Sequence, residues 1–377
     1  MRTVFANRSP MTENLAVSAL PTPLAAQLLA TSAANAPRLA EFRGALTPYE
    51  FDVPAGEIAV LVKGAAAHDL GWMRRVNVRG EDRFRWLSGM VTNSVNDLPS
   101  NGGAWNLVLN AQGRIQGDLT VWREGDALDL EIAADQYERL MAHLDRFIIM
   151  DDVELVSLDA TAETTVGLTG PQAREVLVRM GLPVPAEMMT GQRVEWNGLN
   201  LRIYRGYGTL ADHFEIRTPL AGLTILWRAL STAGATPVGT AALEAFRIAE
   251  GIPLYGIDIA ERDLPQETSQ TRALHFAKGC YLGQEIVERI RSRGNVHKHL
   301  RLLELDGPLA DGGAELFLEG TSVGAITSIA ELPLAGVTRR FALAMVRSEA
   351  EVKNQPLTYG TGPAAGTAKI LDKPSAL

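Results

Sequence analysis

The stretch Val76-Asn77-Val78-Arg79-Gly80-Glu81-Asp82 decides the fold class of this chain. It predicts a short strand that ends at a glycine turn, because apolar and polar residues alternate up to Gly80 and the later apolar residues recur at helical spacing. The same order returns ninety positions later in Val166-Gly167-Leu168-Thr169-Gly170-Pro171-Gln172. Pro171 suits the first turn of the helix predicted there.

Further strand-like runs and a second helical pattern follow each copy. The segments are 105–109, 119–122, 128–132 and a helix over 137–147 in the first copy, and 194–204, 213–217 and a helix over 223–230 in the second. Strand, helix, strands, helix and strand is the ferredoxin-like order. We therefore predict an α+β fold with two related ferredoxin-like units. Chance similarity is the alternative, since only a handful of positions agree.

The pattern changes from Leu300 onward. Short alternating strands, separated by glycine and proline, cover residues 302–305, 322–328 and 342–346. This pattern is typical of a small all-β barrel or sandwich. A chain of 377 residues also exceeds what one hydrophobic core usually organises, so two or three domains are expected.

Charge and cysteine content exclude several classes of protein. The formal net charge of −8 argues against a general nucleic-acid-binding surface, which needs a basic excess. The single cysteine, Cys280, excludes an internal disulfide and fits a reducing compartment, so we expect a cytoplasmic protein. No apolar run has the length needed to span a bilayer, and no membrane partner is expected.

One local stretch is strongly basic. Glu288 alone opposes a series of cationic or titratable side chains, namely Arg289, Arg291, Arg293, His297, Lys298, His299 and Arg301. A solvated helix face and a docking site for an anion are both consistent with this stretch.

The cysteine lies in the octapeptide Lys278-Gly279-Cys280-Tyr281-Leu282-Gly283-Gln284-Glu285. Helical apolar spacing begins at Ile286, so we predict a helix that starts at Gly283 or Gln284. Cys280 then faces the positive end of that helix. This end and the nearby lysine favour the nucleophilic, metal-binding thiolate over the thiol. The alternative is a free cysteine that only packs.

This octapeptide resembles the signature of the YgfZ-type folate-binding proteins of iron-sulfur cluster assembly and repair. Those proteins resemble the glycine-cleavage T-protein, an aminomethyltransferase, in fold. Further similar segments are 246–253, 263–267, 322–328 and 341–347, and the similarity covers roughly residues 45–360. The resemblance implies a three-domain cloverleaf around a central folate channel. The implied parts are an N-terminal extension (1–44), a discontinuous folate-binding domain (45–71 and 161–297), a second α+β domain (72–160) and a C-terminal β-barrel domain (298–377).

The resemblance also implies a tetrahydrofolate site. Glu215 matches the T-protein glutamate that holds the pterin, and one carboxylate can accept two parallel N–H groups of a pterin edge. Tyr207 is expected to stack on the pterin. Asp118 matches an essential aspartate, although T-protein has a second aspartate where this chain has glycine. At the position of Leu243, T-protein has an arginine. The nearest guanidinium in this chain is that of Arg247, which we expect to contact the ligand in its place.

The remaining folate contacts are assigned to the octapeptide and the basic stretch. We expect Lys278, Tyr281 and Gln284 to contact the ligand, and Arg291 and Arg293 to attract the polyglutamate tail of natural folates. No stably bound metal is expected, because iron-sulfur clusters are usually held by four protein ligands and the chain has one cysteine.

These expectations combine into a tetrahydrofolate-binding protein that supports iron-sulfur cluster assembly or repair, with assembly proteins or client enzymes as partners. Cys280, beside the folate pocket, is the expected functional thiol, and Cys280 and Asp118 are the candidate catalytic residues. With one carboxylate fewer than T-protein, the chain is expected to bind folate without ordinary aminomethyl transfer. Two alternatives stay open. They are a folate-dependent aminomethyltransferase acting on a lipoylated carrier, and a tRNA-modification partner that uses residues 289–301.

Overall fold

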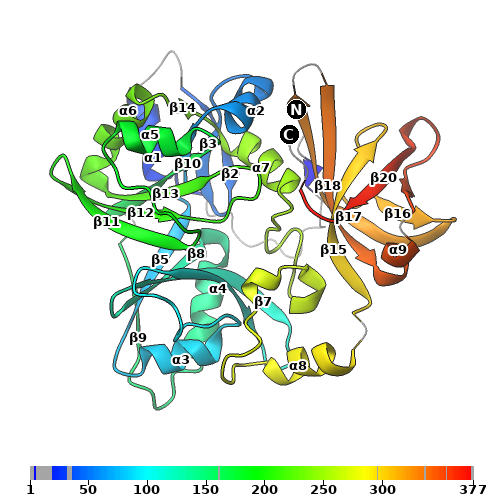
Figure 1. Ribbon diagram of the computed structural model, residues 1–377, viewed down its shortest axis with the longest axis horizontal. Helices are drawn as coiled ribbons and strands as arrows, with labels where there is room; N and C mark the ends of the chain where they lie inside the picture. Colours follow the sequence, from blue (N-terminus) through cyan, green and yellow to red (C-terminus); the bar gives the residue numbers. More distant parts are fainter. Residues whose placement is uncertain are drawn as a thin grey trace.

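The computed structural model describes residues 4–5, 19–31, 36–159, 162–294, 296–334, 337–353 and 355–374. Two α+β units, each built on its own sheet, lie beside a β-barrel (Figure 1). In this view one unit is at the lower left, the other is above it, and the barrel is on the right. The arrangement confirms the predicted α+β class and the C-terminal barrel.

The first unit contains a five-stranded antiparallel sheet with the order β6-β7-β8-β5-β9. Its core includes Val76, Leu87, Leu130 and Leu140, all fully buried. Its elements are β5 (Met73–Arg79), α3 (Arg83–Met90), β6 (Gly103–Leu109), β7 (Ile115–Glu124), β8 (Ala127–Ala133), α4 (Ala134–Asp145) and β9 (Glu154–Ser157).

The second unit contains a six-stranded sheet with the order β11-β12-β13-β10-β4-β14. Val166, Leu177, Phe214 and Leu226 are fully buried in its core. Its elements are β4 (Ala66–Asp69), β10 (Glu163–Thr169), α5 (Ala173–Arg179), β11 (Thr190–Trp196), β12 (Leu199–Arg205), β13 (His213–Pro219), η1 (Leu220–Gly222), α6 (Leu223–Thr232) and β14 (Thr236–Pro237).

The two units repeat one arrangement. Strands β6, β7, β8, β5 and β9 of the first sheet correspond in order to β11, β12, β13, β10 and β14 of the second, with β4 inserted before β14. The registers are also equivalent, because Val76 pairs with Leu130 and Val166 pairs with Ile216. This order confirms that the two segments found ninety positions apart begin related units.

The predicted run 194–204 is wrong in detail, because it forms a hairpin and not one strand. Strand β11 ends at Trp196 and β12 begins at Leu199. Asn197 and Gly198 in the turn have φ angles of 49° and 74°. A type I′ hairpin turn needs positive φ at both central positions, and Asn-Gly is the dipeptide that favours it. Apolar residues on both sides of the turn concealed the chain reversal.

The N-terminal helix α1 (Pro23–Thr31) packs against the second unit. Leu24 and Ala25 of α1 are buried, and Leu24 belongs to the core of that unit. The Thr22 hydroxyl, at the start of α1, donates to the Asp69 carboxylate at the end of β4. The elements in this part of the chain are α1 (Pro23–Thr31), β2 (Arg38–Phe42), β3 (Ala45–Glu50) and α2 (Pro54–Lys63).

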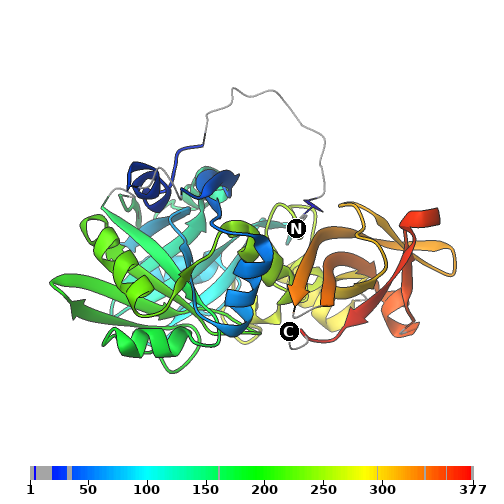
Figure 2. The same cartoon turned by 90° about the horizontal axis from the view of Figure 1, so that it is seen from above.

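The C-terminal strands close into a six-stranded barrel. Their order is β17-β16-β19-β20-β15-β18, and β17 also pairs with β18 to complete the ring. The short strand β1 (Val4–Phe5) pairs with β17 (Figure 2). The other elements are β15 (Lys298–Asp306), β16 (Glu315–Leu318), β17 (Thr321–Leu334), β18 (Val337–Arg347), α9 (Ser348–Lys353), β19 (Leu357–Tyr359), η4 (Gly362–Ala364) and β20 (Gly366–Leu371).

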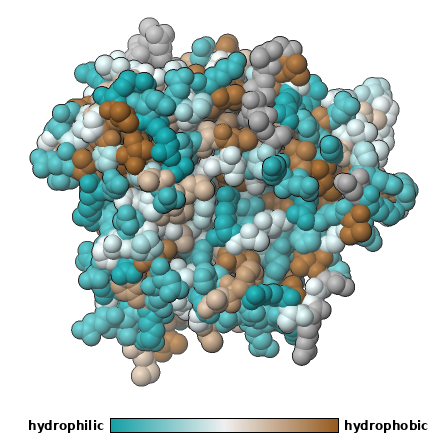
Figure 3. Space-filling model, viewed as in Figure 1, coloured by the Kyte–Doolittle hydropathy of each residue, from teal (hydrophilic) through white to brown (hydrophobic). Residues whose placement is uncertain are grey.

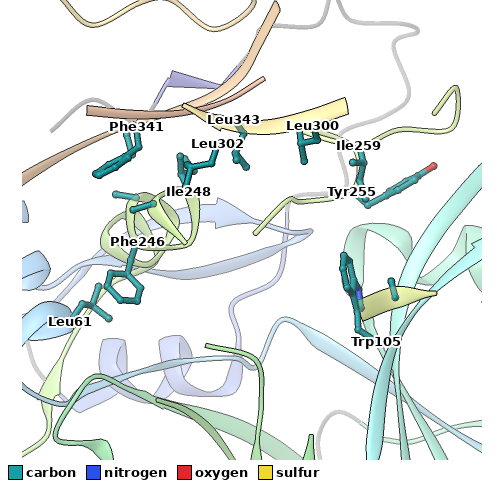
Figure 4. Packing of buried hydrophobic residues seen from close by; sticks show 14 of the residues in the cluster. Leu61, Trp105, Phe246, Ile248, Tyr255, Ile259, Leu300, Leu302, Phe341 and Leu343 are labelled. Carbon is teal, nitrogen blue, oxygen red and sulfur yellow. The ribbon is translucent and has the colours of Figure 1, made fainter. Parts of the chain in front are cut away.

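A shared hydrophobic core joins the barrel to the rest of the chain. Helix α7 (Thr240–Ala249) contributes Phe246 and Ile248 to a cluster that includes Leu302 and Leu343 of the barrel (Figure 4). Trp105 of β6 belongs to the same cluster. The barrel is therefore held by apolar packing against α7. The elements between α7 and the barrel are η2 (Pro265–Thr268), η3 (Thr271–Ala273) and α8 (Gln284–Arg293).

The surface view gives no sign of a broad apolar band on the face that it shows. Hydrophobic residues lie there in separate areas among hydrophilic ones (Figure 3). None of the helices in the described residues has both the length and the hydropathy of a transmembrane span.

A buried ion network connects the two sheets. Arg217 of β13, which is 1% exposed, donates to Glu131 at 2.8 Å and to Asp129 at 3.3 Å, both on β8. Burial alone would lower the pKa of Arg217, but Glu131, Tyr204 and Asp129 raise it. The guanidinium therefore stays charged and neutralises two carboxylates between the sheets.

We expect the substitution Arg217→Leu to lower the free energy of unfolding by about 3–5 kcal/mol, because it leaves two buried carboxylates without their cation. Urea unfolding followed by circular dichroism measures this loss. The control Arg85→Met removes an exposed arginine that pairs with Asp82 and Asp151, and it should have a much smaller effect. Equal effects of the two substitutions would show that the network is not important for stability.

Candidate functional site

The two sheets and α7 enclose a central cavity of about 280 Å³. Aromatic rings make up much of its wall, and a few charged side chains are placed among them. Such a combination of apolar walls and few polar groups is typical of sites for small organic ligands. The rings are Phe42, Trp72, Trp105, Trp122, Tyr207 and Phe246.

Glu215 is an acidic residue of this cavity with an unused hydrogen-bonding atom. It lies on β13 and is 8% exposed. Its Oε2 is buried and has no hydrogen-bond partner in the described protein, while Oε1 lies 3.6 Å from Nε2 of His213. Buried polar atoms are nearly always paired, and leaving one unpaired costs free energy. Glu215 therefore offers a carboxylate oxygen to a ligand with N–H donors.

A chain of polar side chains leads to Glu215 across three neighbouring strands. Nε2 of His68 on β4 lies 2.9 Å from Oγ1 of Thr169 on β10, and this hydroxyl lies 2.8 Å from Nδ1 of His213 on β13. Gly167 makes room for the His68 ring, because a Cβ atom there would lie 1.9 Å from it. All three side chains line the cavity.

The direction of these hydrogen bonds follows from the carboxylate. Because Glu215 can only accept, it favours a proton on Nε2 of His213. With the ring proton on Nε2, Nδ1 of His213 accepts from the Thr169 hydroxyl, which in turn accepts from Nε2 of His68. Burial is the main cause that lowers the pKa of His68 well below its usual range, and the neighbouring His213 ring lowers it further. The His68 ring is therefore neutral. We assign the Nε2–H tautomer to both histidines.

Asp118 also faces the cavity, but both of its carboxylate oxygens have protein partners. Oδ2 accepts from the Trp105 indole N–H at 2.9 Å, and Oδ1 accepts from the Gln136 amide at 2.8 Å. These bonds hold the carboxylate in place on β7. They leave further lone pairs for a ligand, since an ionised carboxylate accepts about four hydrogen bonds.

Tyr207 and Arg247 are the other predicted folate residues in the cavity wall. Tyr207 lies 4.6 Å, ring centroid to Cζ, from the guanidinium of Arg272, which the sequence analysis did not select. Arg247 is engaged by the protein itself. It donates to Glu244 at 3.0 Å, to Asp258 at 2.7 Å and to the Ile252 carbonyl at 2.9 Å. Its contacts connect α7 to the loop that follows it.

Cys280 lies outside the wall of the central cavity. It is exposed, and it lines surface grooves together with Arg85 of α3 and Asp151. The structure therefore places the thiol and Glu215 on different surfaces. In the described residues, no three His, Cys, Asp or Glu side chains are grouped to hold a metal ion.

The loop that carries Cys280 is held by the end of α3. Lys278 Nζ donates to the carbonyls of Ser88, Val91 and Asn93 at 2.6–2.7 Å. The Leu282 N–H donates to the Gly89 carbonyl at 2.9 Å. Burial lowers the pKa of Lys278 to about 8. The lysine thus binds carbonyls at and after the end of the helix, and in the described structure it does not donate to Cys280.

The start of α8 agrees with the prediction. The helix begins at Gln284, and Gly283 precedes it with φ of 81°. A Cβ atom at Gly283 would lie 2.5 Å from the Asn110 carbonyl oxygen, so glycine is required there. Tyr281 is buried in the shared core, and burial raises its pKa to about 12. Gln284 accepts from the Tyr281 N–H at 3.3 Å.

The basic stretch has acidic partners from other parts of the chain. Lys298 pairs with Asp263 at 2.6 Å, and His299 and Arg301 both pair with Glu351. Arg291 lies over the Phe276 ring and 3.6 Å from Glu288. The side chain of Arg293 lies outside the described part. These pairs reduce the positive charge available to a polyglutamate tail or to tRNA.

Several residues of the cavity escaped the sequence analysis, among them His68, His213 and Arg272. Glu250 is another omission, and its Oε1 accepts from the N–H groups of Thr209 and Leu210 at 2.8 and 2.9 Å. These residues lie on strands and loops that are distant in sequence. The histidine in front of Phe214-Glu215-Ile216 was a usable signal, because residues two apart on a strand share a face.

Comparisons with known proteins identify the family. Residues 24–278 match the family of the GCVT N-terminal domain, so the chain belongs to this family. It is similar to an aminomethyltransferase of Rubrobacter xylanophilus, with 29% identity over 322 residues that cover 83% of this chain and 84% of that protein. An aminomethyltransferase of Thermoanaerobacter is 24% identical over 336 residues, which cover 85% of this chain and 91% of that protein.

A crystal structure shows the same fold. The glycine cleavage system aminomethyltransferase T from Bartonella henselae superposes with a TM-score of 0.82, covering 93% of this chain and 96% of that one, at 21% identity. The likeness extends over both α+β units and the barrel. It establishes the architecture of the chain and leaves its activity to be argued from the cavity.

We expect ¹⁵N NMR at about pH 8, where an ordinary imidazole is neutral, to show the Nε2–H tautomer of His213. In Thr169→Val the hydroxyl is lost, and the two tautomers should become mixed. Thr224→Val, which removes a hydroxyl that donates to Gln27 away from the cavity, serves as the control. A predominant Nδ1–H tautomer in the unaltered protein would contradict the assigned direction of the chain.

Proposed function

We propose that this protein binds a reduced folate in the central cavity, with the pterin edge on Glu215. The observation that carries the proposal is the buried Oε2 of Glu215, which has no protein partner. A pterin presents an N–H and an amino group side by side, and a carboxylate accepts both. The use of tetrahydrofolate by members of the family supports this ligand.

The rest of the cavity wall fits the same ligand. A pterin is flat and mainly apolar on its faces, and the aromatic rings of the wall can pack against such faces. Tyr207 would bind the pterin by stacking, and Asp118 would accept from an amine of the ligand. The His68-Thr169-His213 chain would keep the Oε1 side of Glu215 occupied and direct Oε2 to the ligand.

We expect Glu215→Gln to weaken tetrahydrofolate binding by about 10- to 100-fold, because the amide can accept only one of the two donors and loses the charge. Equilibrium titration followed by fluorescence measures the dissociation constant. The control Glu195→Gln changes an exposed glutamate on β11 of the same sheet. Unchanged affinity in Glu215→Gln would remove Glu215 from the site.

We further propose that the folate-bound protein supports iron-sulfur cluster assembly or repair through Cys280. The exposed position of the thiol, on a loop held at both sides by α3 carbonyls, supports contact with a partner protein. One thiolate cannot hold a cluster that needs four ligands, so ligation would be shared with that partner.

In a cell that lacks the native gene, Cys280→Ser is expected to leave the activity of iron-sulfur enzymes low, because the substitution removes the thiolate and keeps the shape of the side chain. Enzyme assays on cell extracts provide the measurement. The purified variant should keep its melting temperature and its affinity for tetrahydrofolate. Full rescue of the enzymes by the variant would exclude a role of the thiol.

Aminomethyl transfer from a lipoylated carrier protein is the second candidate function. The position of Asp118 in the cavity and the names of the similar aminomethyltransferases favour it. Folate-dependent release of ammonia from such a carrier would establish the activity, and Asp118→Asn should reduce it while tetrahydrofolate still binds. Absence of ammonia release with pure components would remove this candidate.

A further inference from the structure

We propose that Arg272 is a second ligand anchor of the cavity, which binds an oxygen acceptor of the reduced folate while Glu215 binds its N–H donors. This inference rests on the proposed folate binding and extends it to the recognition of the ligand's hydrogen-bond acceptors. It starts from the Arg272 guanidinium, which lines the cavity and has no hydrogen-bond or ion-pair partner in the described protein.

The guanidinium of Arg272 contacts two aromatic rings. Its Cζ lies 5.3 Å from the ring centroid of Trp105 and 4.6 Å from that of Tyr207. Contact with ring faces orients the guanidinium plane but uses none of its N–H groups. The rings therefore fix the position of five potential donors.

The backbone around Arg272 is also fixed. Its carbonyl accepts from the Asn93 side chain at 2.8 Å, and the carbonyl of Ala273 accepts from the Thr92 hydroxyl at 2.6 Å. Both donors belong to the loop after α3, so the first unit holds the segment. A binding group on a rigid support loses little entropy when a ligand arrives.

The donors of Arg272 have no acceptor within the described chain. Nε is buried without a partner, and the guanidinium forms no ion pair or hydrogen bond with other described residues. Glu250 is close enough to act on its charge, but it forms no hydrogen bond or ion pair with Arg272 in the described part of the chain, and its Oε1 accepts from two backbone N–H groups. A buried donor without an acceptor is unfavourable, and Nε of Arg272 is such a donor. An oxygen of a ligand would remove this cost.

The other arginine of the cavity wall provides a contrast. Arg247 donates to two carboxylates and a carbonyl, so its donors are used by the protein. Arg272 is therefore the arginine of this wall that can serve a ligand.

Two consecutive residues, Gly206 and Tyr207, connect Glu215 with Arg272. Oε1 of Glu215 lies 3.3 Å from the position of a Cβ atom at Gly206, and the next residue, Tyr207, contacts Arg272. One cavity thus combines an acceptor-only oxygen with a donor-only group. A ligand that satisfies both must carry N–H donors and an oxygen acceptor, as a folate does.

Two oxygens of a folate have the required chemistry, namely the 4-oxo group of the pterin and a carboxylate of the glutamate tail. Three probes separate them in equilibrium titrations. The probes are tetrahydrofolate, a tetrahydropterin without the p-aminobenzoylglutamate part, and a 2,4-diamino analogue of tetrahydrofolate that lacks the 4-oxo oxygen.

The test variant is Arg272→Met, which keeps an apolar stem beside the two rings and removes the donors. We expect it to bind tetrahydrofolate about 10- to 100-fold more weakly, as the loss of charge-assisted hydrogen bonds requires. If the 4-oxo group is the partner, the tetrahydropterin shows the same loss and the diamino analogue shows none. If a carboxylate is the partner, the diamino analogue shows the loss and the tetrahydropterin does not.

The control is Arg228→Met on α6, where the arginine is exposed, and it should bind all three probes normally. Normal tetrahydrofolate binding by Arg272→Met, together with weak binding by Glu215→Gln, would overturn the role of Arg272 and leave the proposed function intact. Absence of tetrahydrofolate binding by the unaltered protein would overturn both.

A second measurement needs no folate. Removing a partly buried guanidinium whose Nε has no partner should not lower the melting temperature of the unliganded protein, so Arg272→Met is expected to melt at or above the temperature of the unaltered chain. A lower melting temperature would show that Arg272 acts as a structural residue, and would overturn the proposal.

Discussion

The ion network of Arg217 with Asp129 and Glu131 is the interaction on which the central cavity depends. It joins β13 of one sheet to β8 of the other, and the guanidinium is almost completely shielded from water. Burial and the nearby Glu215 raise the pKa of Glu131, whereas Arg217 lowers it. The cation is therefore needed to keep carboxylates of both sheets close together. Without it, Glu131 of one sheet and Glu215 of the other would act on each other without the cation that Arg217 supplies between the sheets.

The site as a whole is built from strand positions that only the sheet order brings together. Strand β4 is inserted beside β10, and this insertion places His68 next to Thr169 and, one strand further, His213. The resulting chain of hydrogen bonds ends at His213, whose Nε2 lies 3.6 Å from the Glu215 carboxylate that faces the cavity. In the same cavity, the rings of Trp105 on β6 and of Tyr207 in the loop before β13 contact Arg272. Acceptor and donor functions thus come from different parts of the chain and meet at one cavity.

Sequence analysis could predict the regular parts of this architecture, because they follow from local periodicity. The strand and helix patterns gave both α+β units and the barrel, and the start of α8 followed from the apolar spacing after Cys280. The Asn197-Gly198 hairpin was missed because apolar residues continue on both sides of the turn. Glu215, Asp118 and Tyr207 could be placed in one cavity through a resemblance. Arg272 and His68 could not be placed there, since the rings that contact Arg272 and the hydroxyl that binds His68 are far away in sequence. The position of Cys280 outside the cavity also could not be foreseen. It depends on Lys278, which holds the cysteine loop against the end of α3 through carbonyls that are distant in sequence.

The equivalent registers of the two units have a consequence for assembly. Because Leu130 and Ile216 occupy corresponding positions, Glu131 of the first unit corresponds to Arg217 of the second. The duplicated halves therefore carry opposite charges at the same place of a common framework. Two copies of the first half would bring carboxylates face to face, and two copies of the second would oppose guanidinium groups. Only the unlike pair is electrostatically matched, which disfavours pairing of either half with a second copy of itself.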